Sequence, residues 1–262
     1  MPRLTWDNVG ERFYETGVDR GVLYVGSDAG VAWTGLISVT QTPSIGTAKE
    51  YYLDAVKYVN LAPSEEFAAT IDAYTYPNEF GQCDGTASAY TGLFITQQPR
   101  KPFGLSYRTL IGNDADGESA YKIHIVYNAT AFPSEKVFKS LSGSSDPTEF
   151  SWDITTRPPA MPGYKPTAHI EIDTRTASSG SVSDIEDILY GTDITPSRIP
   201  TLAELIDVFN DNQPFVVIDL GDGSYTVLGP ADMITMLDAD TFEITSPSAI
   251  FIDADSYTLS SI

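Results

Sequence analysis

The 262-residue sequence is poor in the residue types that most often build a chemical site. It has one cysteine, Cys83, so it can form neither an intrachain disulfide nor a thiolate metal cluster, and a reducing compartment fits. The only two histidines, His124 and His169, lie singly within predicted strands, and neither has a His or Cys partner at metal-ligand spacing. We therefore expect no metal site and no cofactor.

Positive charge is scarce as well. The chain has 15 Lys and Arg against 36 Asp and Glu, a formal net charge of −21. Binding to a phosphate backbone needs clustered cations, so this balance argues against sequence-specific DNA or RNA binding. No apolar run approaches the ~18 residues of a transmembrane helix, and we expect no membrane segment. The first 14 residues lack the apolar core of a secretory signal, and we expect none there.

Familiar catalytic patterns are missing from the sequence. There is no Gly-x-Ser-x-Gly elbow, no Walker loop and no dinucleotide glycine pattern. The acidic stretches at 219–223, 238–240 and 253–255 offer oxygen ligands, but none completes a calcium-binding loop. We expect no enzyme. Two alternatives stay open: a soluble β-sandwich module that binds carbohydrate or calcium, and a hydrolase that uses a pair of acids.

The hydrophobic pattern predicts a mainly β protein, a β-rich α+β fold. Apolar and polar residues alternate with period two, as in Tyr121–Tyr127, and short links rich in turn residues favour antiparallel pairing. We predict strands at Val22–Val25, Val31–Thr40, Tyr51–Tyr58, Phe67–Tyr74, Leu105–Ile111, Tyr121–Tyr127, Phe150–Thr156 and Ala168–Asp173. Helical spacing predicts three short helices, over Glu135–Leu141, Ser183–Leu189 and Leu202–Phe209.

The composition changes near the C-terminus, which divides the chain into a domain at 1–210 and an acidic β-rich module at 211–262. The module contains nine of the 36 acidic residues and no Lys, Arg or His, whereas the domain contains every cation. Within the module we predict a hairpin from Phe215–Leu220 and Ser224–Leu228, a helix over Pro230–Leu237, and acidic turns that lead into strands at 238–244 and 253–259. Residues 174–183 resemble a linker.

Tyrosines are concentrated in one region of the domain, at Tyr51, Tyr52, Tyr58, Tyr74 and Tyr76. Such a group suits either a sugar-stacking platform or the half-buried surface of a sheet and a subunit contact. We favour the second, because long strands with few blunting charges also suggest that other subunits cover the sheet edges.

Several blocks of the sequence resemble the major tail tube proteins of long-tailed (siphovirus-type) phages that infect actinobacteria. They keep their order over about the first 200 residues, and the acidic module lies beyond them. The blocks are Arg12–Val25, Tyr51–Tyr58, Glu66–Phe80, Gln98–Thr109 and Glu186–Thr192.

This resemblance implies a structural virion protein, a small antiparallel β-sandwich or barrel with a flanking short helix. Six copies would form a ring with a shared inner β-barrel, and stacked rings would form the tail tube that conducts the genome. The implied partners are further copies, the tape-measure protein, and the tail terminator and distal tail proteins. Assembly would take place in the host cytoplasm. Double-stranded DNA would pass through the lumen without specific binding.

By position, we expect residues 1–21 to form an arm and the connection at 40–50 to make the stacking contacts between rings. An anionic lumen would keep DNA from adhering, and Asp72 is our candidate for a lumen-facing acid. The candidate stacking residues are Thr42, Pro43, Ser44, Ile45, Gly46 and Thr47.

Overall fold

The structure is a computed structural model that describes residues 5–45, 49–61, 65–115, 117–138, 140 and 147–211, together with five short strands between residues 215 and 252. The chain divides into two units. The first comprises residues 1–177 and 186–200, and the second comprises residues 178–185 and 201–262.

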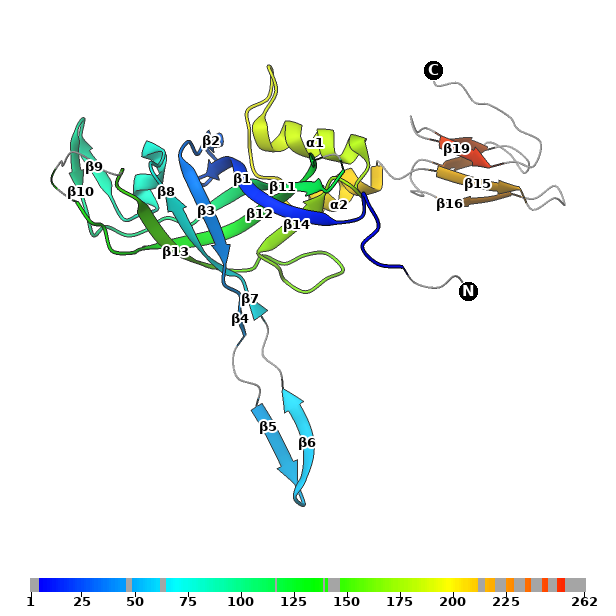
Figure 1. The fold of residues 1–262 in the computed structure, drawn as a ribbon, viewed down its shortest axis with the longest axis horizontal. Coiled ribbons are helices and arrows are strands. Elements are labelled where there is room, and N and C mark those ends of the chain that lie inside the picture. The colour runs from blue at the N-terminus through cyan, green and yellow to red at the C-terminus, as the bar shows by residue number, and fades with distance from the viewer. Residues whose placement is uncertain are drawn as a thin grey trace. The chain divides into compact units, whose positions relative to one another are not determined.

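The first unit is built on one eight-stranded antiparallel sheet, which confirms the predicted mainly β fold (Figure 1). The hydrogen-bonded order is β2-β1-β11-β12-β13-β8-β3, and β14 also pairs with β12. These strands are β1 (Phe13–Tyr24), β2 (Val31–Ala32), β3 (Leu36–Gln41), β8 (Ala68–Ala73), β11 (Phe103–Asn113), β12 (Gly117–Pro133), β13 (Phe150–Thr156) and β14 (His169–Asp173).

Shorter elements complete this unit. Three two-stranded ribbons pair β4 (Ser44–Ile45) with β7 (Glu65–Glu66), β5 (Lys49–Leu53) with β6 (Val56–Leu61), and β9 (Ala87–Tyr90) with β10 (Leu93–Ile95). A 3-10 helix, η1, spans Asn78–Gln82. The described residues also form two α-helices: α1 (Ser179–Tyr190), whose last turns belong to the first unit, and α2 (Leu202–Asp211), which belongs to the second.

Strand β12 is the central strand of the sheet and is 17 residues long. Its first half pairs with β14 over Lys122–Val126, and its second half pairs with β13 over Ala129–Pro133. Asn128 lies between these two regions with a φ of 49°, a left-handed conformation that asparagine adopts more readily than most residues. The register against β11 also shifts beside this position, as at a β-bulge. The bulge therefore marks the point where β12 changes its neighbour.

One face of the sheet encloses an aromatic core. Trp152 packs edge-on against Phe80, with ring centroids 5.0 Å apart, and against Trp33 at 6.0 Å. The Trp33 amide donates a hydrogen bond to the Gly21 carbonyl at 2.7 Å, which ties the segment before β3 back to β1. The sheet thus curls around these rings, and aliphatic side chains from five strands fill the space between them.

The opposite face of β1 and β11 lies against the end of α1 that belongs to the first unit, as expected for a flanking helix. The Tyr24 hydroxyl donates a hydrogen bond to the Leu189 carbonyl at 2.8 Å. Arg108 donates two hydrogen bonds to the Asp19 carboxylate, at 2.9 and 2.7 Å, and its guanidinium lies 3.6 Å from Glu186. These contacts hold the Asp19 pKa below its ordinary value, because the Arg108 hydrogen bonds favour the charged carboxylate.

Two predicted helices are confirmed. The segment predicted at Ser183–Leu189 forms α1, which begins earlier, at Ser179, inside the stretch that resembles a linker. The segment predicted at Leu202–Phe209 forms α2, and Thr201 caps it. The Thr201 hydroxyl accepts a hydrogen bond from the Glu204 amide, and the Glu204 carboxylate accepts one from the Thr201 amide, each at 3.2 Å. This reciprocal pair is a capping box.

Two other predicted helices are wrong. Residues 135–138 of the predicted helix Glu135–Leu141 are not helical, because Lys136 extends to the buried Asp84 carboxylate, 2.8 Å away, and holds the segment against the core. Within the predicted helix Pro230–Leu237 the structure has a strand, β17 (Ile234–Met236), which pairs with β18 (Phe242–Ile244). Pairing with β18 outweighs the weak helical spacing of residues 230–237.

The second unit contains the acidic C-terminal residues. The predicted hairpin is confirmed as β15 (Phe215–Asp219) paired with β16 (Tyr225–Leu228), and β19 (Ala249–Ile252) adds to β15 in parallel. Residues 253–259, where a second acidic turn and strand are predicted, lie outside the described residues. Among the helices that the structure describes, none is long and apolar enough to cross a membrane.

Candidate functional site

Hairpin β5–β6, labelled in Figure 1, has several large apolar side chains that are exposed to solvent. Isolated two-stranded hairpins are marginally stable in water, and a contiguous exposed apolar patch usually marks a contact with another molecule. Six large apolar side chains of this hairpin are between 38% and 76% exposed, and we call them the hairpin surface: Tyr51, Tyr52, Leu53, Val56, Tyr58 and Val59.

The local sequence explains the hairpin. Asp54 and Ala55 both have positive φ, 50° and 63°, as in the type I′ turn that matches the twist of two antiparallel strands. The prediction of one continuous strand over Tyr51–Tyr58 is wrong, because this turn divides it. Across the two strands Glu50 pairs with the Lys57 ammonium, and this hydrogen bond is the main cause of a lowered Glu50 pKa.

The candidate stacking residues lie on the path of the chain into this hairpin. The Thr42 amide donates a hydrogen bond to the Ala68 carbonyl at 2.8 Å, and β4 pairs Ser44 with Glu66. Residues 42–45 thus continue the β3–β8 pairing as a ribbon instead of forming a loop. Gly46 and Thr47 lie outside the described residues. The part that these six residues play in stacking stays a prediction.

Asp72 lies on the face of β8 that points away from the aromatic core. Its carboxylate accepts a hydrogen bond from the Ser38 hydroxyl at 2.7 Å, and on the same face the Thr70 hydroxyl donates to Asp153 at 2.7 Å. The sequences of β3, β8 and β13 contain two acids and no Lys or Arg. We call this polar surface of three strands the Asp72 face, and its only charges are negative. Its position in a lumen stays a prediction.

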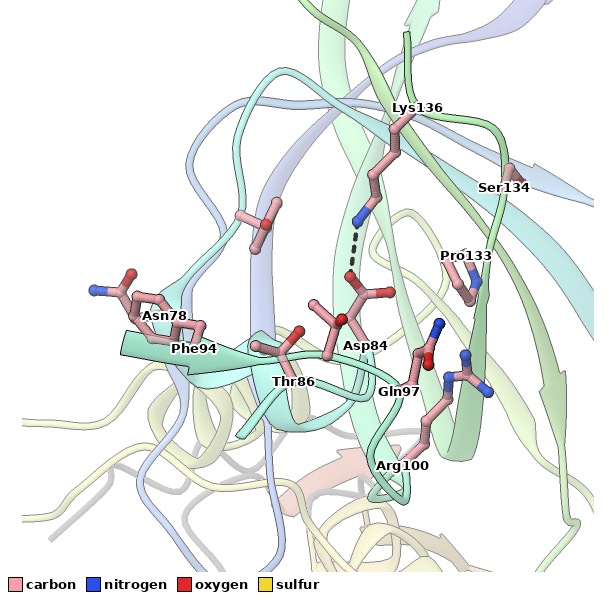
Figure 2. A pocket seen from close by; sticks show the side chains of 12 residues that line it. Asn78, Asp84, Thr86, Phe94, Gln97, Arg100, Pro133, Ser134 and Lys136 are labelled. Carbon is pink, nitrogen blue, oxygen red and sulfur yellow. Dashed lines mark hydrogen bonds and ion pairs between the residues drawn. The ribbon is translucent and has the colours of Figure 1, made fainter. Parts of the chain in front are cut away.

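A groove of about 570 Å³ runs between η1, hairpin β9–β10 and the segment after β12 (Figure 2). At its base Asp84 accepts hydrogen bonds from the Lys136 ammonium at 2.8 Å and from the Trp152 indole at 3.0 Å. Both oxygens of this carboxylate are therefore engaged in holding the structure together. Beside it, burial raises the pKa of the Cys83 thiol to about 12, so this cysteine is a poor nucleophile.

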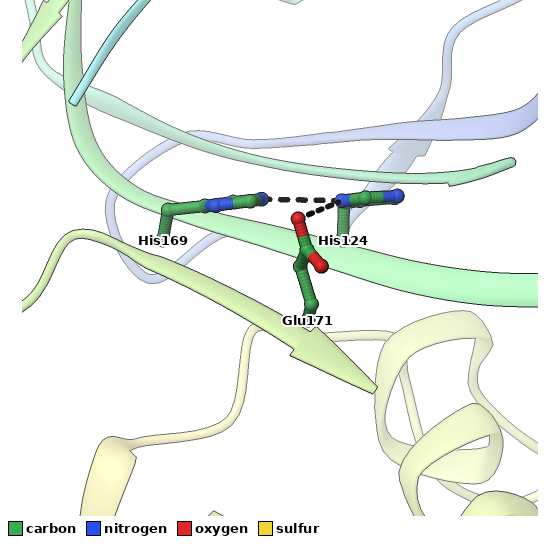
Figure 3. A group of neighbouring side chains, drawn as sticks. All are labelled: His124, His169 and Glu171. Carbon is green, nitrogen blue, oxygen red and sulfur yellow. Dashed lines mark hydrogen bonds and ion pairs between the residues drawn. The ribbon is translucent and has the colours of Figure 1, made fainter. Parts of the chain in front are cut away.

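The two histidines meet across β12 and β14 (Figure 3). His124 Nδ1 lies 3.2 Å from His169 Nε2, and Glu171 Oε1 lies 3.7 Å from His124 Nδ1. Burial lowers the pKa of each histidine to about 4, so both rings are neutral near pH 7. Sequence reasoning treated them as separate strand residues. The alternating pattern predicts the face of its own strand on which each histidine lies. It does not predict the β12–β14 register that brings the two rings together.

Comparisons with known proteins give weak structural likeness only. No family model and no curated protein matches the sequence. A chain in the structure of the sheath-tube complex of PVC, an extracellular contractile injection system, is similar with 15% identity over 59% of this chain and 89% of that chain, at a TM-score of 0.32. The tube-terminating cap of the anti-feeding prophage (AFP) is similar with 11% identity over 66% and 97%, at a TM-score of 0.33. Likeness at this level carries no functional assignment.

Proposed function

We propose that this chain is a structural tail protein that assembles with further copies of itself into a tube. The observation that carries this proposal is the hairpin surface, whose apolar side chains are exposed in the single chain. Their burial against a second chain would remove that area from water and stabilise the contact. The sequence blocks that resemble tail tube proteins make another copy of the chain the natural partner.

The edge of the sheet supports a ring. Strand β3 ends the hydrogen-bonded order of the sheet and contains no proline and no charged residue to block pairing. Pairing of β3 with the sheet of a neighbouring copy would continue that sheet around an axis, and such head-to-tail contacts close into a ring under rotation. Six copies in each ring, as in the resembled family, would give the shared inner barrel.

The Asp72 face supports a conduit for DNA. A wall with negative charges and no cation repels the phosphate backbone, so DNA would pass without being held. In this proposal β3, β8 and β13 line the lumen, and the hairpin surface contacts the next ring. The tape-measure, tail terminator and distal tail proteins are the further partners, and the assembled virion tail is the location.

The proposal is tested by electron microscopy and solution scattering of the purified chain. We expect rings or tubes from the wild type, and we expect Tyr58→Asp to abolish tubes by placing a charge in a contact that becomes buried. The matched control is Tyr164→Asp, because Tyr164 is 74% exposed and Tyr58 is 76% exposed. The control should assemble like the wild type.

Other outcomes would overturn the proposal. A wild-type chain that stays monomeric and melts at a higher temperature in the presence of sugars or calcium would favour the β-sandwich binding module. Turnover of a glycoside that is lost on a single Asp→Asn or Glu→Gln change would favour an acid-pair hydrolase. Equal assembly of the two tyrosine variants would remove the hairpin surface from the contacts between subunits.

A further inference from the structure

The rings of His124 and His169 lie end to end in one plane (Figure 3). Their planes differ by 5°, and their centroids are 5.4 Å apart, which exceeds the 3.2 Å between the facing nitrogens by about one ring width. Each nitrogen therefore points at the other. Two nitrogens that bind a tetrahedral metal at ~2.0–2.1 Å are about 3.3 Å apart, so the observed N···N spacing suits a shared metal, although the two lone pairs point along the N···N line and must turn toward the metal.

A third ligand atom lies beside these nitrogens. Nitrogen atoms of both histidines and an oxygen of Glu171 all lie within 4.8 Å of one another. Two imidazole nitrogens and one carboxylate oxygen form a ligand set that suits zinc and its neighbours in the first transition row. The Glu171 side chain is 45% exposed, so it is free to move toward a metal. With three protein ligands, the fourth coordination position of a tetrahedral metal would be open to water.

We propose that His124, His169 and Glu171 form a binding site for a divalent transition metal of the zinc class, with His124 Nδ1, His169 Nε2 and a Glu171 oxygen as ligands. Such a site would join β12 to β14 through side chains in addition to the backbone pairing. It is independent of tube formation, because all three ligands come from one chain.

The surroundings of the site hold the two rings in place. His124 Nε2 lies 3.0 Å from the Thr109 hydroxyl, so a proton on Nε2 leaves the Nδ1 lone pair facing the site. The ring of Tyr107 stacks on His124 with centroids 4.7 Å apart, and Phe67 stacks on His169 at 4.4 Å. Turning each ring by about 35° within its own plane, which preserves both stacks, would direct the two nitrogens at a metal ~2.0–2.1 Å from each.

Protons and charges near the site are consistent with metal binding. In the metal-free pair, one nitrogen of the N···N contact carries the hydrogen, and a metal would require His169 to hold its proton on Nδ1 instead. This is a change of tautomer, so no net proton is released. Lys122 lies 3.8 Å from the other Glu171 oxygen and also pairs with Glu15, which leaves Glu171 Oε1 available to the metal.

The experiment titrates the full chain, stripped with a chelator, with Co²⁺ and with Zn²⁺. Co²⁺ reports coordination through its visible absorption, and Zn²⁺ affinity is measured by competition with a chromophoric chelator. We expect one strong equivalent per chain and a rise in Tm with zinc. Loss of a residue that supports a ligand weakens metal affinity by roughly 10- to 100-fold. Loss of a ligand itself should weaken zinc affinity by at least that much.

The variants are chosen so that folding and binding are separated. Glu171→Gln removes a ligand at an exposed position on β14, and Glu118→Gln removes the same formal charge at an exposed position on β12. The first should lose the strong equivalent, the visible Co²⁺ signal and the zinc-dependent rise in Tm, whereas the second should keep all three. Several weak equivalents that are the same in both variants would overturn the site and show nonspecific binding to an acidic surface.

Discussion

The centre of the sheet and hairpin β5–β6 use similar residues under opposite conditions. Around Trp152 the aromatic rings are buried, and the indole donates its hydrogen bond to a carboxylate of the same chain. In the hairpin, tyrosines of comparable size are exposed, Tyr52 by 61% and Tyr58 by 76%. The first region is complete within one chain. The second leaves its apolar side chains in contact with water, and this exposure is the observation on which the proposed contact with another copy rests.

Removal of the Trp152 ring from the core should have the largest effect on stability. We expect Trp152→Ala to lower the free energy of unfolding by about 3–5 kcal/mol, because it leaves a cavity and takes a hydrogen-bond donor from Asp84. Denaturant unfolding, at a concentration where scattering shows single chains, measures this. Trp6→Ala, at a residue that is 74% exposed, is the control and should change stability little. Equal losses in both variants would contradict the contrast.

A charged group at the edge of the core should have an intermediate effect. Arg108→Ala removes the partner of Asp19 and Glu186, and we expect a loss of about 1–3 kcal/mol, because Arg108 is buried while Asp19 is partly solvated. The same denaturation experiment measures it. Arg12→Ala is the control, since Arg12 is 53% exposed in its pair with Asp114 and should contribute ~0–1 kcal/mol. An unchanged free energy of unfolding in Arg108→Ala would mean that the end of α1 packs on the sheet without help from this cation.

A change in the turn of hairpin β5–β6 should have the smallest effect. Ala55 has a φ of 63°, which costs alanine energy and glycine almost none, so Ala55→Gly should favour the hairpin turn by about 0.5–1 kcal/mol. The concentration needed for tubes should fall roughly two- to fivefold, as turbidity or scattering can measure. Ala68→Gly, in a regular strand, is the control and should raise that concentration or leave it unchanged. An unchanged value for Ala55→Gly would separate the turn from assembly.

Much of the sheet was predictable from alternation alone. The strand Phe150–Thr156 was predicted with the bounds that the structure gives it, because its buried and exposed residues alternate between two turn-rich segments. The capped helix after Thr201 was predictable for a similar local reason. These elements are encoded within a few residues of themselves.

The errors arise where distant residues decide the local structure. The segment 135–138 has helical spacing, but Lys136 reaches a carboxylate that is far away in the sequence. The Asp54–Ala55 turn lacks the glycine that usually signals a type I′ turn, so its strands were merged. The pair of histidines depends on the register between β12 and β14, which no single-strand pattern contains. The candidate site was therefore less predictable than the fold.

Strand β12 also has a mechanical consequence. It is hydrogen-bonded to β11 along one edge and to β14 and then β13 along the other. It therefore joins strands β1 and β11, which contact the end of α1, to the strands of the Asp72 face. A force that pulls these two groups apart along the strand direction would load many hydrogen bonds of β12 in shear at the same time. Bending of a filament made from this chain would then be resisted inside each subunit as well as at the contacts between subunits.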